Sequence, residues 1–131
     1  MKPERIGAIA MAFTELRNKL QIYHWQTENY ARHKSSDELI KVLDKQVDTF
    51  IETIQGTNNT RLIIPSDDKF ITFTRYQNYT DENIINVLKS FKTWLIKKIP
   101  LYLKDENTDL YNIRDEILSS INQTIYLFTF S

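Results

Sequence analysis

Apolar side chains recur at steps of three and four residues in four segments of this chain, and that periodicity restricts its fold more than any other feature. An amphipathic helix buries one stripe of such side chains, so each segment predicts one helix. The segments cover residues 3–27, 33–55, 80–103 and 108–129. We therefore predict an all-α fold, with residues 1–131 forming one domain, an up-down four-helix bundle.

The stretch between the second and third segments, residues 57–80, lacks the helical pattern and contains Pro65. A connection of this length is long for a plain loop, but it suits a crossover that runs along a helical bundle. The turn between the first two segments, around Thr27–Lys34, is short and polar, so these two helices should be antiparallel neighbours. Ser35 with Glu38 predicts a capping box for the second helix, and Gly56 predicts its end. Thr80, followed by two acidic residues, predicts the N-cap of the third helix, which Pro100 should end or kink.

Composition and charge exclude several functions. The chain carries 17 basic and 17 acidic side chains, so we expect no binding to nucleic acid or to an anionic membrane, which requires a clustered basic surface. Zero cysteines exclude disulfides, thiolate metal sites and cysteine nucleophiles. The apolar run near the N-terminus is too short for a signal peptide or a membrane span. We therefore expect a cytoplasmic protein.

Two histidines and three carboxylates form the candidate site, and they are His24, His33, Asp37, Asp48 and Glu52. From His33 the next three follow at intervals of four, eleven and four residues, which places them on one side of a helix. Imidazole and carboxylate together make a ligand set suited to iron. The alternative is structural: a histidine at the edge of the core, and an acidic helix edge that faces solvent.

The spacing also divides the candidate site into two halves. Asp37 and Asp48 lie about 16 Å apart along one helix, so they cannot bind the same ion. His24 should lie level with His33 and Asp37, whereas Asp48 and Glu52 lie opposite the middle of the first helix. A twofold-related second subunit could bring one half against the other and would form two equal sites. If a metal is bound, we expect it between subunits.

The same residues, with Trp25 and Tyr30, resemble the Dps branch of the ferritins, the mini-ferritins that protect DNA during starvation. The resemblance covers roughly residues 5–56, although the His24–His33 connection is shorter than is usual in that family. It implies a ferritin-like bundle that binds and oxidises ferrous iron at an intersubunit site, for iron storage or protection from oxidative stress. His24, His33 and Asp37 would act from one subunit, and Asp48 and Glu52 from the other.

The resemblance leaves several properties open. The site could hold one iron or two, with zinc or manganese as alternative metals, and the twofold interface could build a dodecameric cage. The fourth segment also looks similar to uncharacterised ferritin-like proteins of large DNA viruses, which would place the protein in the host cytoplasm or in the virion. The chain would be a ferroxidase-type oxidoreductase if the metal site is intact. The alternative is a non-enzymatic oligomeric or virion component that has kept this fold and lost the site.

Overall fold

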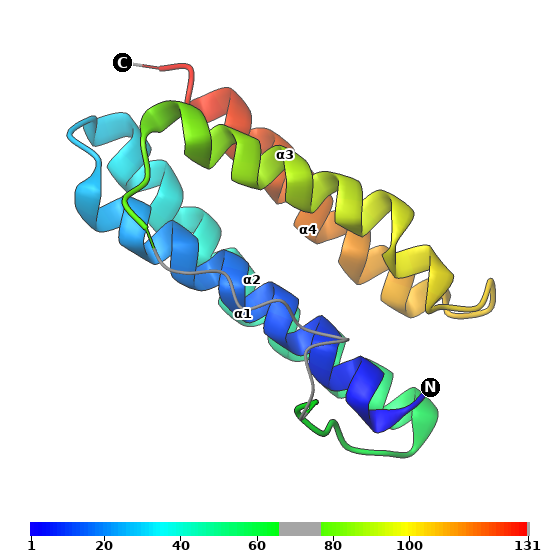
Figure 1. The fold of residues 1–131 in the computed structure, drawn as a ribbon. Coiled ribbons are helices and arrows are strands. Elements are labelled where there is room, and N and C mark those ends of the chain that lie inside the picture. The colour runs from blue at the N-terminus through cyan, green and yellow to red at the C-terminus, as the bar shows by residue number, and fades with distance from the viewer. Residues whose placement is uncertain (66–76, 131) are drawn as a thin grey trace.

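The computed structural model describes residues 1–65 and 77–130, and these ranges form four α-helices and one short 3-10 helix (Figure 1). α1 spans Pro3–Gln26, α2 spans Tyr30–Asn58, α3 spans Asp81–Lys97 and α4 spans Thr108–Leu127; the 3-10 helix η1 spans Ile99–Leu101. No strand occurs within these ranges. The prediction of an all-α protein with four helices packed as a bundle is confirmed. Within the same residues, no helix is long and apolar enough to cross a membrane.

The turn between α1 and α2 is shorter than the sequence indicated, because α2 begins at Tyr30 rather than at residue 33. Asn29 is the N-cap: its side chain accepts a hydrogen bond of 2.9 Å from the Arg32 backbone N–H. The predicted capping box at Ser35 is therefore wrong. Ser35 is buried inside the helix, and its hydroxyl donates to the Ala31 carbonyl one turn earlier.

α2 also continues past Gly56, the predicted stop, to Asn58. The helix ends where Asn59 adopts the left-handed conformation, at φ 48° and ψ 48°. Asparagine tolerates this conformation better than most residues, so it can replace glycine at a helix end.

The third and fourth helices begin and end for reasons the sequence partly showed. Thr80 is the predicted N-cap of α3, and it forms a reciprocal capping box with Asn83. α3 ends at Lys97, earlier than the predicted residue 103, because Pro100 has no N–H to donate and its ring excludes a continuing α-helix. The chain turns there through η1. α4 begins at Thr108, as predicted, and ends two residues before the predicted 129.

The four helices form two antiparallel hairpins, α1 with α2 and α3 with α4, which lie side by side in Figure 1. α2 also packs against α4, and α3 packs against α1, so each helix has two antiparallel neighbours. α2 and α3 run in the same direction, so the connection between them must return along the bundle.

The described ends of that connection lie at opposite ends of α1. The Ile63 backbone N–H donates to the Pro3 carbonyl at 3.1 Å, whereas the Tyr79 N–H donates to the Gln26 side chain at 2.9 Å. Pro3 and Gln26 are about 35 Å apart at 1.5 Å per residue, which supports the predicted lengthwise crossover. Residues 66–76, the central part of the predicted 57–80 crossover, lie outside the described residues.

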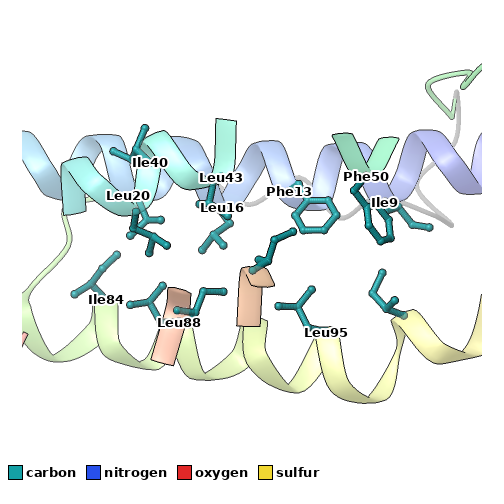
Figure 2. Packing of buried hydrophobic residues seen from close by; sticks show 14 of the residues in the cluster. Ile9, Phe13, Leu16, Leu20, Ile40, Leu43, Phe50, Ile84, Leu88 and Leu95 are labelled. Atoms are coloured by element: carbon teal, nitrogen blue, oxygen red, sulfur yellow. The ribbon is translucent and has the colours of Figure 1, made fainter. Parts of the chain in front are cut away.

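The core lies between the two hairpins and consists of the predicted apolar stripes (Figure 2). Phe13 of α1 lies near its centre, with ring centroids 5.6 Å from Phe50, 5.5 Å from Phe91 and 5.4 Å from Trp94. These edge-to-face and tilted arrangements are favourable for aromatic pairs. One side chain thus joins α1, α2 and α3.

Candidate functional site

The two histidines meet at the turn between α1 and α2. His24 lies in the last turn of α1 and His33 in the first turns of α2. Their imidazole rings stack with centroids 3.9 Å apart and planes inclined by 18°. The short turn is what brings the rings face to face. The sequence predicted that these two histidines lie level with each other, and the structure places them in contact.

A reciprocal pair of hydrogen bonds fixes both rings. His24 Nδ1 lies 2.7 Å from the His33 carbonyl oxygen, and His33 Nδ1 lies 2.9 Å from the His24 carbonyl oxygen. A carbonyl oxygen can only accept, so Nδ1 is the protonated nitrogen in each ring. The lone pair of a neutral ring is then on Nε2, the arrangement typical of histidines that bind metals through Nε2.

The buried Ser36 completes this arrangement. Its hydroxyl oxygen lies 3.1 Å from His24 Nδ1, and the hydroxyl donates to the His33 carbonyl at 3.0 Å. The stacking also limits the chemistry. Two lone pairs in nearly parallel planes cannot both point at one ion at a bond length of about 2.1 Å. The pair therefore offers two separate nitrogen ligands rather than a chelate.

Asp37 lies one turn after His33 on α2, where it is already paired. Its carboxylate is 3.1 Å from the Lys41 ammonium. The hydrogen bond from Lys41 holds the pKa of the Asp37 carboxyl below its ordinary value, and the charges of Lys41, His24 and His33 act in the same direction. This carboxylate is anionic at neutral pH, as a metal ligand must be. A metal would have to compete with Lys41 for it.

Asp48 and Glu52 lie farther along α2 and are exposed. They are about 16 Å and 22 Å from Asp37 along the helix axis, at 1.5 Å per residue. Within the described ranges 1–65 and 77–130, no group of three or more histidine, aspartate and glutamate side chains could hold a metal ion. One chain therefore brings His24 and His33 together near Asp37, and keeps the other two carboxylates apart from them.

An open groove follows the α1–α2 surface between these two halves. It has a volume of about 320 Å³, and Asp48 lines it together with apolar side chains that include Phe13, Val47 and Ile51. Arg17 of α1 and Asp44 of α2 also line it and form an ion pair of 3.1 Å. The charge of this groove is therefore mixed, with Arg17 as its cation and Asp44 and Asp48 as its acids.

Arg32 organises the same end of the bundle, and sequence reasoning missed it. Its guanidinium donates to the Phe128 carbonyl at 3.0 Å, the Asp81 carbonyl at 2.8 Å and the Tyr23 hydroxyl at 3.1 Å. The Tyr23 hydroxyl in turn donates to the Asp81 carboxylate at 2.6 Å. Burial and this carboxylate raise the pKa of Tyr23. One arginine on α2 therefore links α1, the start of α3 and the end of α4.

No sequence signal identifies Arg32 or Ser36 as supporting residues. Two of the three acceptors for Arg32 are backbone carbonyls, which every residue carries, and one belongs to a residue 96 positions away. In the sequence, nothing distinguishes Ser36 from an ordinary polar residue near the start of a helix. Tyr23 gave a partial signal, because a tyrosine on an apolar stripe needs a partner for its hydroxyl.

Comparisons with known proteins place the chain in one family. No curated protein and no solved structure matches the chain. A family model matches residues 24–128, which include both histidines, all three candidate carboxylates and most of the bundle. The chain therefore belongs to the family described as a family of unknown function, DUF5856.

Proposed function

We propose that this protein is a ferritin-like, Dps-like iron-binding protein that oxidises ferrous iron at sites shared between two subunits. The observation that carries this proposal is the fixed histidine pair. Both Nδ1–H groups are bonded to carbonyls, so two Nε2 ligands are available beside the anionic Asp37. Two further carboxylates lie on the same helix, too far away to reach these nitrogens within one chain.

The register of α2 supports a twofold partner. Asp37 and Asp48 have their midpoint between residues 42 and 43, and so do His33 and Glu52. A single twofold axis at that level would therefore bring Asp37 against Asp48 of the other subunit, and His33 against its Glu52. The histidine half and the carboxylate half would meet twice, once on each side of the axis.

The α1–α2 surface beside residues 42 and 43 is suited to contact with a second copy of the chain. On α1, Ala10, Arg17 and His24 are spaced by seven residues and share one face. On α2, Asp44 falls in the same sector of about 100° as His33, Asp37, Asp48 and Glu52. The Arg17–Asp44 pair would meet its own copy at the axis, each arginine facing an aspartate of the other subunit. Such a surface is self-complementary in charge.

The chain's residues would then have distinct roles. Each Nε2 would bind a separate ferrous ion, and the carboxylates would offset the charge that increases on oxidation. Two ferrous ions supply the two electrons that reduce one hydrogen peroxide to two hydroxides, and dioxygen is the alternative oxidant. Storage of the ferric product would require a larger cage, such as a dodecamer, built on the same twofold interface.

Subunit complementation tests the proposal. One variant, Asp48→Asn with Glu52→Gln, removes the carboxylate half, and a second, His24→Asn with His33→Asn, removes the Nε2 ligands. An asparagine amide can still donate from about the position of Nδ1. Each variant alone should oxidise ferrous iron no faster than buffer does. Coexpressed in equal amounts, they should recover about a quarter of the wild-type rate, because half of the random dimers contain one intact site of two.

The rates of the mixture and of wild type distinguish a shared iron site from the alternatives. No recovery in the mixture, with both variants folded, would contradict a shared site. A wild-type rate equal to that of iron in buffer would leave the second candidate function, a non-enzymatic oligomeric component. The ion pair between Asp37 and Lys41 and the reciprocal histidine bonds favour that candidate, because these groups already have partners without a metal.

A further inference from the structure

A cavity lies at the end of the bundle opposite to the histidines. It measures about 520 Å³, within the usual range for small-molecule sites. The start of α1, the end of α2 and the connection between α3 and α4 surround it. Figure 1 shows these segments at the end of the molecule where the N-terminus lies. None of the candidate metal ligands lines it.

The charge of this cavity differs from that of the whole chain. Lys2, Arg5 and Lys104 line it, and Glu106 is the one acidic side chain among the lining residues. The chain as a whole has equal numbers of basic and acidic side chains. Within the described residues, the ammonium groups of Lys2 and Lys104 have no ion-pair partner. The excess positive charge is therefore local and available to an anion.

Two helix starts also border the cavity. α1 and α4 have Lys2 and Asn107 as their N-cap residues, and both line the cavity. Neither side chain caps its helix; the Asn107 carboxamide oxygen accepts instead from the Lys104 backbone N–H at 2.8 Å. The chain itself already uses part of these helix starts: Asp109 accepts from the Leu110 N–H at 2.9 Å, and the Lys2 carbonyl accepts from the Arg5 N–H at 3.0 Å. The positive charge of the cavity therefore comes mainly from its basic side chains.

The lining also has an apolar part. Leu101, Leu103 and Leu110 contribute side chains, and Leu101 is 71% exposed, so its side chain is accessible to a ligand. The Tyr102 ring lies beneath the Arg5 guanidinium, 4.6 Å from its carbon to the ring centroid. A ligand that matches this lining needs an apolar or aromatic body as well as a negative charge.

We propose that this cavity binds a small amphipathic organic anion, with its acidic group between Lys2 and Lys104 and its apolar body against Leu101 and Tyr102. The inference is independent of the iron proposal, since the two regions share no residue and lie at opposite ends of the bundle.

The probe for this site is 8-anilinonaphthalene-1-sulfonate, an aromatic sulfonate whose fluorescence rises on binding to an apolar surface. Wild type should bind it saturably. Lys104→Gln should weaken binding about tenfold, the loss typical of one charge-assisted hydrogen bond. Leu101→Ser should weaken binding as well, through the body of the probe. Lys89→Gln removes an exposed lysine of α3 outside the cavity and is the matched control.

A second probe separates the contribution of charge to binding from that of apolar contact. N-phenyl-1-naphthylamine has the same aromatic body without the sulfonate, and it should bind much more weakly and be insensitive to Lys104→Gln. Equal binding of the two probes, no saturable binding by wild type, or equal losses in Lys89→Gln and Lys104→Gln would overturn the proposal. Circular dichroism of each variant checks that its fold is intact.

Discussion

At the scale of single residues, the histidine pair shows how a short turn can prepare a ligand. Three residues separate α1 from α2, so the carbonyl at the end of one helix reaches the imidazole at the start of the other. Each imidazole donates from Nδ1 to the backbone carbonyl of the other histidine, so Nδ1 carries the proton in both rings. The same contacts therefore stabilise the turn and leave Nε2 as the nitrogen for a ligand.

Substitution of His33 separates the two roles. His33→Asn can keep a donor to the His24 carbonyl, so the free energy of unfolding should fall by only about 1 kcal/mol, mainly from lost stacking. Iron oxidation should fall sharply, because residue 33 then offers no Nε2 and only that of His24 remains. His33→Ala is the comparison, since it removes the donor too and should cost about 1–3 kcal/mol more. Urea denaturation and absorbance of ferric iron measure the two effects. An active, folded His33→Asn would show that His33 is no ligand.

Residue spacing predicted the face of α2 that carries the carboxylates, but not the state of each carboxylate. The four- and eleven-residue intervals follow directly from helix geometry. Helix geometry also allows Asp37 to pair with Lys41 four residues later, but it does not determine that Asp44 pairs with Arg17 of another helix. Such pairings depend on side-chain rotamers and on the rotation of one helix against another, which spacing within one helix does not determine.

At the scale of whole elements, apolar periodicity located all four helices, whereas their ends depended on local competition. The expected caps Ser35 and Gly56 both lie inside α2, because Asn29 and Asn59 supply the boundaries. Thr80 was identified correctly, because Asp81 and Glu82 directly after it mark the first turn of a helix. A cap is predictable when its hydrogen bonds are local and few rival residues are nearby.

The two glycines give a matched test of how the crossover is attached to α1. A Cβ at Gly7 would collide with the Ile63 carbonyl oxygen, whereas a Cβ at Gly56 meets nothing within 4 Å. Both positions are helical, so helix propensity alone favours alanine at each by about 1 kcal/mol. We expect Gly56→Ala to raise the free energy of unfolding by up to that amount, and Gly7→Ala to lower it by about 1–3 kcal/mol through overpacking. Equal, stabilising effects in thermal melts would mean that Ile63 does not press against α1.

At the scale of the whole molecule, the bundle has two chemically different ends. The histidines and the Arg32 network lie at one end, and the basic cavity lies at the other. The α1–α2 surface joins them, with apolar side chains and the Arg17–Asp44 pair in its groove. The proposed metal site would require a second copy, because Asp48 and Glu52 lie along this surface and away from the histidines. The cavity at the basic end is lined by one chain alone.

Charge reversal at the centre of that surface tests the assembly. Arg17→Asp would place two added carboxylates beside the two Asp44 side chains at the proposed axis, and like charges there should weaken the dimer at least about tenfold. Combining Arg17→Asp with Asp44→Arg restores opposite charges and should restore the dimer. Lys89→Asp, on α3, is the control for net charge and should leave assembly unchanged. Sedimentation of each protein over a range of concentrations gives the dissociation constants. A wild type that is monomeric at concentrations on the order of tens of micromolar, or an Arg17→Asp variant that dimerises as well as wild type, would exclude this surface as the twofold interface.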